Sequence, residues 1–214
     1  MLIDQLGSAA THYKVGLQSY LAFGRQFVEE LLAGGKEVFL DLKFFDIPNT
    51  VRHAVYEAAA IGVSLVTVHA LGGKAMLEAA VEEAQKHAFS GHVTNVLAVT
   101  YLTSFTQETL PLPWQRQSDF AQQVLDLAQV ADDAGLHGVV CSALELSAVK
   151  ERFAHLAALV PGIRPQGSLT QDQARVATPA FAKRYGANYL VVGRPITSAP
   201  DPRAALEAIL QELL

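Results

Sequence analysis

The sequence contains few of the features on which several classes of protein depend. It has one cysteine among 214 residues, so no disulfide can form within the chain. No apolar run approaches the roughly 18 residues of a membrane span, and no secretory signal opens the chain. Basic residues do not cluster and the net charge is −5, which argues against a nucleic-acid partner. We therefore expect a cytoplasmic protein that binds neither membranes nor nucleic acids.

The usual motifs of metal and cofactor enzymes are also missing. The chain has no Gly-rich dinucleotide loop, no Walker loop, no zinc-protease helix motif and no hydrolase nucleophile elbow. The histidines lack the spacing of metal ligands, and Cys141 lies in an apolar run without an activating partner. The sequence thus predicts no metal and a Cys141 that packs in the core.

The chain does contain a regular alternation of apolar runs and amphipathic segments. Half of the residues are hydrophobic, enough for the core of one large α/β domain over residues 1–214. The apolar runs are typical of parallel strands covered on both faces. We expect strands at residues 12–16, 37–42, 65–69, 96–100, 138–142, 159–163 and 189–193. Helices are expected at 19–33, 49–60, 73–86, 118–134 and 201–213.

This alternation fits either an open doubly wound sheet or a closed (β/α)8 barrel. Residues 1–6 resemble the end of a helix, so a strand and the start of that helix would be missing ahead of Met1. Seven strands would leave two unpaired edges where a barrel closes. Our expectation is a (β/α)8 TIM barrel whose first strand is missing from this chain.

The most informative stretch runs from Asp41 to Pro48 and follows an apolar run that ends at Leu40. Side chains two residues apart in a strand share one face, so Asp41 and Lys43 are expected to point the same way. Asp46 would lie beyond the strand, in a turn. Unlike charges on an interior face are costly unless they pair or take part in chemistry. A purely structural salt bridge is the alternative reading.

Polar residues also follow the other predicted strands. In a barrel these strand ends open on one face, which carries the active site. Gly193 and Arg194 suggest a phosphate site, because glycine lets backbone N–H groups approach an anion and arginine binds phosphate in a bidentate way. Arg164 lies in a second loop of the kind that holds phosphate in barrels. The full set is Lys14, Asp41, Lys43, His69, Thr100, Thr103, Arg164 and Arg194.

Taken in order, these residues resemble the orotidine 5′-phosphate decarboxylase family over nearly the whole chain. The ten residues from Asp41 to Thr50 look like the family's signature. Related sugar-phosphate barrels carry a similar D-x-K, so the full set of matching segments in their order is more specific than this core alone. The other matching segments are Lys14–Gly16, Val68–Ala70, Leu102–Ser104, Gly138–Ser142, Pro161–Gly167 and Val192–Thr197.

The resemblance implies an enzyme that converts orotidine 5′-phosphate (OMP) to UMP without metal or organic cofactor. Lys14, Asp41, Lys43 and Asp46 would form a charged array, with Lys43 as the proton donor to carbon 6 of the pyrimidine. Asp46 and Thr50 would reach into the site of a neighbouring subunit in a homodimer. By the same resemblance Thr103 would meet the pyrimidine edge, and the 5′-phosphate would be held by Arg164, Gln166, Gly193 and Arg194.

The chain departs from the family pattern at two places. Family members begin with a strand that ends in an aspartate, and nothing before Lys14 supplies it. Relatives often carry a polar aromatic residue or histidine where this chain has Phe45. Two alternatives therefore stay open: a D-x-K sugar-phosphate decarboxylase or aldolase that uses a metal, and a catalytically impaired barrel that only binds nucleotides.

Overall fold

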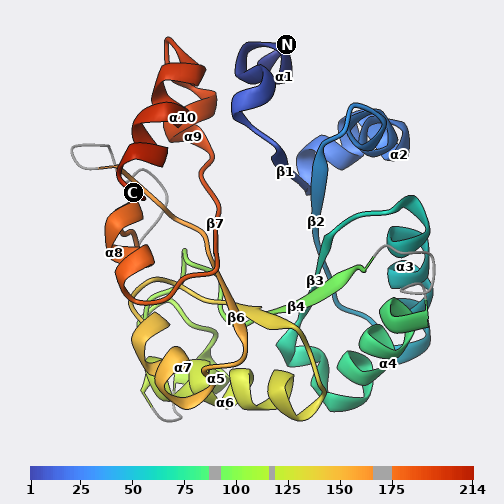
Figure 1. Cartoon of the computed structure of the whole chain (residues 1–214). Coiled ribbons are helices and arrows are strands. Elements are labelled where there is room, and N and C mark those ends of the chain that lie inside the picture. Colours follow the sequence, from blue (N-terminus) through green and yellow to red (C-terminus); the bar gives the residue numbers. More distant parts are fainter. Residues whose placement is uncertain (87–92, 116–118, 166–174) are drawn as a thin grey trace. The chain divides into compact units, whose positions relative to one another are not determined.

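The computed structural model describes residues 1–86, 93–115, 119–165 and 175–214 (Figure 1). Short strands alternate with helices along the described chain, and the strands follow one another in the sheet in the order of the sequence, β1 to β7. A doubly wound sheet would reverse this order at a switch point. The strand order therefore favours the barrel class over the open sheet.

The strands lie close to the expected positions. Their bounds are β1 His12–Gly16, β2 Glu37–Phe44, β3 Leu65–His69, β4 Asn95–Val99, β5 Gly138–Val140, β6 Ala157–Val160 and β7 Tyr189–Leu190. The strand β2 runs two residues further than predicted, to Phe44, whereas β5 and β7 are shorter than their apolar runs. Apolar composition shows that a segment is buried, but the extent of the hydrogen-bonded ladder depends on the neighbouring strand.

All five expected helices occur within the described ranges; α4 has the expected bounds, and the other four are shifted at one or both ends. They are α2 Leu17–Ala33, α3 Pro48–Ile61, α4 Gly73–Lys86, α6 Phe120–Asp133 and α10 Pro202–Gln211. Five further helices are too short to give a clear periodic pattern. These are α1 Leu2–Leu6, α5 Leu112–Gln115, α7 Leu146–Arg152, α8 Pro179–Arg184 and α9 Arg194–Thr197.

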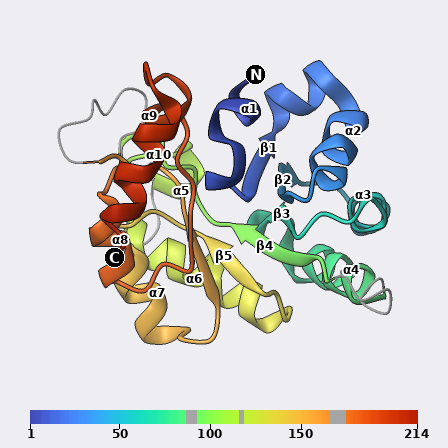
Figure 2. The ribbon, with the colours of Figure 1, turned by 45° about the horizontal axis from the view of Figure 1, so that its top comes forward.

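The described chain divides into two compact units, and the first contains residues 11–100 and 127–139. Within it β1, β2, β3 and β4 pair in parallel, and helices α2, α3 and α4 lie along one side of these strands (Figures 1 and 2). Helix α3 begins with Pro48 and ends at Gly62, whose φ of 95° suits glycine. This arrangement brings the carboxyl ends of β1, β2 and β3 side by side.

The pairing of β2 with β3 contains an irregularity just before the end of β2. Leu40 pairs with Val66 but Phe44 pairs with Val68, so β2 uses four steps where β3 uses two. Within this bulge Lys43 has a φ of 53°, the one positive φ of a non-glycine residue in the part of the chain that the structure describes. Bulges of this kind re-aim side chains and occur next to active sites.

The second unit contains residues 1–10, 101–126 and 140–214. Within it β6 pairs in parallel with β7, and helix α1 packs against helix α10. A single bridge joins Ile163 to Ala177, just beyond the end of β6. No helix in the described ranges is long and apolar enough to cross a membrane.

Candidate active site

Three charged side chains meet at the ends of β1 and β2. The ammonium of Lys43 donates to Asp41 Oδ1 at 2.8 Å, and the ammonium of Lys14 lies 3.3 Å from Asp41 Oδ2. The carboxylate of Asp41 is only 12% exposed, whereas about a third of each lysine side chain is open to solvent. We call Lys14, Asp41 and Lys43 the lysine–aspartate cluster. It holds two ammonium groups at one edge of the sheet around a single shared carboxylate.

A threonine from β3 completes the surroundings of Asp41. Thr67 is fully buried; its hydroxyl donates to Asp41 Oδ1 at 3.0 Å and accepts from the Lys43 backbone N–H at 3.0 Å. Thr67 was not among the site residues predicted from the sequence. A hydroxyl in the middle of the apolar run from Leu65 to Val68 was the available signal, because a buried hydroxyl needs a hydrogen-bond partner.

The surroundings of Asp41 keep its carboxyl group ionised. Burial alone would raise the pKa of Asp41, but the charges of Lys43 and Lys14 and the hydrogen bonds from Lys43 and Thr67 outweigh burial and lower it. An unfolded aspartate has a pKa of about 3.9. Ionised Asp41 therefore contributes stability above that pH, and this contribution is lost as the pH falls through the lowered folded-state pKa.

The backbone also fixes the direction of the Lys43 side chain. A left-handed conformation costs an L-residue about 1–2 kcal/mol, so the fold retains it only where the surroundings determine it. Gly16 at the end of β1 leaves room for the second ammonium, since a Cβ there would lie 2.8 Å from Lys14 Nζ. Lys14 and Lys43 thus contact different oxygens of the Asp41 carboxylate.

Asp46 does not join this cluster within the chain. Its carboxylate accepts the N–H of Ile47 at 2.6 Å, in the exposed turn that leads to α3. Thr50, in the first turn of α3, is exposed as well. Two large apolar side chains flank the turn, with Phe45 59% and Ile47 66% exposed. Within the described residues the structure unites Lys14, Asp41 and Lys43 and leaves Asp46 and Thr50 on the surface.

His69, at the end of β3, lies beside the cluster. Its Nδ1 accepts the N–H of Leu71 at 3.4 Å, and its ring centroid is 5.5 Å from that of Phe45. Burial, and then the positive charge of Lys43, lower its pKa from the ordinary value of 6.5. The histidine is therefore neutral at pH 7.

Replacing Lys43 with methionine should raise the pKa of His69, because the variant removes a neighbouring cation. An NMR titration of the histidine ring signals measures this pKa in both proteins. Lys74→Met is the matched control, since Lys74 pairs with Glu78 on the exposed face of α4. A His69 pKa that stays the same in Lys43→Met would contradict the cluster geometry.

The second unit carries the cationic residues predicted to bind phosphate. Arg164 follows β6, is 7% exposed and donates to the carbonyl of Ile163 at 2.9 Å. Burial, and then the positive charge of Arg194, lower the pKa of Arg164. Guanidinium groups are suited to binding phosphate oxygens in a bidentate way. Arg194 is exposed at the start of α9, with Gly193 as the preceding cap residue.

Two further residues are predicted to contact the ligand, and the structure describes one of them. Thr103 lies in the loop after β4 and is 8% exposed. It sits inside a turn that closes when the Phe105 N–H donates to the Leu102 carbonyl at 2.9 Å. Gln166 falls outside the described residues. In the described ranges no group of three or more His, Cys, Asp or Glu residues could hold a metal ion.

Comparison with known proteins decides the family. The orotidine 5′-phosphate decarboxylase / HUMPS family matches residues 1–209. The chain belongs to this family. The orotidine 5′-phosphate decarboxylase of Halorhodospira halophila is 48% identical over 217 residues, which cover 99% of this chain and 89% of that protein. The enzyme of the same name from Lactobacillus delbrueckii subsp. bulgaricus is 44% identical over 203 residues, covering 94% and 85%.

Solved structures agree with this membership. The crystal structure of orotidine 5′-phosphate decarboxylase from Lactobacillus acidophilus superposes with a TM-score of 0.82 at 40% identity, over 94% of this chain and 85% of that one. The likeness confirms that the fold is of the TIM-barrel class.

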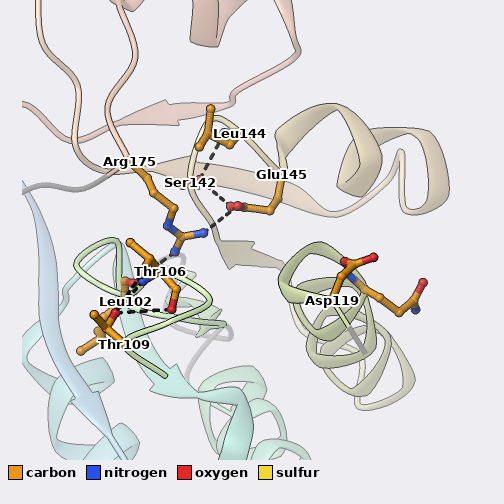
Figure 3. A network of polar contacts seen from close by, with 9 residues as sticks. Leu102, Thr106, Thr109, Asp119, Ser142, Leu144, Glu145 and Arg175 are labelled. Carbon is orange, nitrogen blue, oxygen red and sulfur yellow. Dashed lines mark hydrogen bonds and ion pairs between the residues drawn. The ribbon is translucent and has the colours of Figure 1, made fainter. Parts of the chain in front are cut away.

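A buried network in this family member was also missed from the sequence. Arg175 donates from Nη1 to Glu145 Oε1 at 2.6 Å and from Nη2 to the Leu102 carbonyl at 3.1 Å (Figure 3). The second oxygen of Glu145 accepts the hydroxyl of Ser142. We call Leu102, Ser142, Glu145 and Arg175 the Arg175 network. Cys141 lies beside it and is fully buried; burial, and then the charge of Glu145, raise the pKa of its thiol to about 12.

Proposed function

We propose that this chain is a cytoplasmic enzyme that decarboxylates orotidine 5′-phosphate to UMP in pyrimidine biosynthesis, without metal or organic cofactor. Membership of the family supports decarboxylation of orotidine 5′-phosphate. The observation that carries the proposal is the fixed ammonium of Lys43, 2.8 Å from Asp41 and set by a backbone of positive φ. A lysine held in this way is preorganised to stabilise negative charge.

The chemistry explains why such an ammonium is needed. When the bond between carbon 6 of the pyrimidine and its carboxylate breaks, carbon dioxide leaves and the electron pair stays on carbon 6. The ring offers this carbanion no electron sink, so a nearby cation must stabilise it. Lys43 then transfers a proton to carbon 6 as general acid, giving UMP and a neutral amine that takes up a proton from water.

Asp41 and Lys14 have supporting roles in this proposal. Asp41 stays ionised because its pKa is lowered, so it places a negative charge close to the substrate carboxylate. That repulsion disappears when carbon dioxide leaves. Lys14, 3.3 Å from the second oxygen of Asp41, offsets part of the added charge.

The 5′-phosphate of the substrate would be held by cationic residues. Arg164 and Arg194 together offer two guanidinium groups to a dianionic phosphate. Gly193 and Gln166 complete this group, and Thr103 contacts the pyrimidine edge. Binding energy from the phosphate, far from carbon 6, is available to orient the reacting ring.

The proposed enzyme acts as a homodimer with shared sites. Asp46 and Thr50 are exposed and lie outside the cluster of their own chain, as expected for residues that act in a partner's site. The exposed side chains of Phe45 and Ile47 beside them offer apolar surface for the contact between subunits. The fourth member of the charged array would therefore come from the other chain.

The test of the proposed function is the loss of the ultraviolet absorbance of orotidine 5′-phosphate on addition of the purified chain, with a chelator present. We expect turnover and stoichiometric formation of UMP. Activity that disappears with chelator and returns with a divalent cation would favour the metal-dependent sugar-phosphate class instead. A folded protein that binds UMP and shows no turnover would contradict the proposal and favour the impaired nucleotide-binding barrel.

A further inference from the structure

The Arg175 network links three segments of the second unit that have little regular structure of their own. Leu102 lies in the loop after β4, Ser142 and Glu145 lie in the segment between β5 and α7, and Arg175 comes after β6 (Figure 3). The side chains of Arg175 and Glu145 are each only 7% exposed. One guanidinium group therefore fixes the relative positions of these segments.

The arginine is held on three sides. Its two terminal nitrogens bond to Glu145 at 2.6 Å and to the Leu102 carbonyl at 3.1 Å. Its guanidinium carbon lies 4.2 Å from the centre of the Phe120 ring. The planar fork of arginine makes both hydrogen bonds at once, which the single ammonium of a lysine cannot reproduce in the same geometry.

The contact with Leu102 reaches the proposed substrate site through one turn. The Leu102 carbonyl that accepts from Arg175 also accepts the N–H of Phe105 at 2.9 Å. Thr103, the residue proposed to meet the pyrimidine, lies between the two ends of this turn. A shift of the Leu102 carbonyl would therefore displace Thr103.

Stability alone does not account for this arrangement. A buried ion pair seldom stabilises a fold more than apolar side chains of similar volume would, because both charges lose their hydration. Such pairs have a clearer use in fixing one conformation, and here the conformation is that of a loop bearing a substrate contact.

We propose that Arg175 and Glu145 are positioning residues, which set the orientation of Thr103 toward the pyrimidine through the Leu102 carbonyl. The proposal rests on the proposed function, because it concerns the same substrate. Arg175 itself makes no contact with the substrate in this proposal. A displacement of a contacting group by about 1 Å costs roughly 10²-fold in rate.

A double-mutant cycle tests the inference. Arg175→Lys keeps the charge and loses the fork, while Thr103→Val keeps the volume and loses the hydroxyl. We expect each single variant to lower kcat/KM for orotidine 5′-phosphate by about 10- to 100-fold. In the Thr103→Val background, Arg175→Lys should have no further effect. If the losses in kcat/KM of the two single variants multiplied in the double variant, the proposal would be overturned.

A second variant and a second readout separate positioning from folding. Glu145→Gln keeps an acceptor for Ser142 but weakens the hold on Arg175, so it should show the same coupling to Thr103 as Arg175→Lys does. The matched control is Arg52→Lys, which alters the Arg52–Glu82 pair between α3 and α4 and should leave kcat and KM unchanged. A merely structural role would lower the melting temperature and the active fraction, with KM and UMP affinity unchanged.

The activity of the wild-type chain determines which of the two proposals a negative result contradicts. An active wild type with an additive cycle would refute the positioning role and leave the decarboxylase intact. An inactive wild type would refute the proposed function, and the same cycle measured on UMP affinity by calorimetry would then decide the role of Arg175. A wild type that neither turns over orotidine 5′-phosphate nor binds UMP would overturn both.

Discussion

Lys43→Ala should abolish turnover of orotidine 5′-phosphate, with a loss of at least about 10⁴-fold in kcat. In the proposed function the variant removes both the cation beside carbon 6 and the acid that protonates it, and each such role is worth about 10²-fold or more. The fold should survive, because Asp41 keeps its hydrogen bond from Thr67 at 3.0 Å and the Lys14 ammonium at 3.3 Å. The measurement is the decay of substrate absorbance together with circular dichroism.

Lys74→Ala provides the matched control for this prediction. It removes an exposed lysine of α4 that lies 3.7 Å from Glu78, and it should leave both activity and stability close to wild type. If the Lys43→Ala protein turned over the substrate at a normal rate, Lys43 would not be the proton donor. If it failed to fold, its affinity for UMP would be lost together with its activity.

Two inactive variants should form an active enzyme when their chains are combined. Asp46→Ala alone should lose about 10²-fold or more in kcat, because in the proposed homodimer it removes a charge from the site of the partner chain. In a dimer of one Asp46→Ala chain and one Lys43→Ala chain, one site has all of its charged residues and the other has lost two. The purified mixed dimer should therefore show about half of the wild-type activity, since one site in two is complete.

Co-expression with two different affinity tags yields the mixed dimer for this measurement. The control is a mixed dimer in which both chains carry Lys43→Ala and which should stay inactive. Full activity of the Asp46→Ala homodimer, or a monomer in sedimentation analysis, would contradict the shared site. If activity is recovered only in the mixed dimer that has been purified through both tags, Asp46 acts in the site of the partner chain.

The charged pair of β2 shows what local sequence pattern predicts and what it misses. Strand alternation predicts that Asp41 and Lys43 share a face, and their atoms do meet at 2.8 Å. The ladder with β3, however, is irregular between Leu40 and Phe44, and Lys43 has a positive φ. Such a bulge depends on the partner strand and on Thr67, so no local pattern in residues 37–44 could specify it.

The Arg175 network marks the second limit of the sequence. The sequence predicts β1 and β3 with their observed bounds, and in β3 four consecutive buried residues explain the clear apolar run. Arg175 and Glu145 are 30 residues apart and Arg175 and Leu102 are 73 apart. A contact across such a separation follows from the topology. Neither Arg175 nor Glu145 belongs to a run with helical or strand periodicity that would single it out.

The single cysteine, Cys141, can report on local unfolding of the segment around it. Cys141 is fully buried at the end of β5, and its thiol has a pKa of about 12, so almost no reactive thiolate exists in the native state. A thiol reagent can therefore modify the chain only during excursions that expose the segment after β5. The rate of modification measures the free energy of those excursions, and because Cys141 adjoins Ser142, it reports on the Arg175 network without any engineered label.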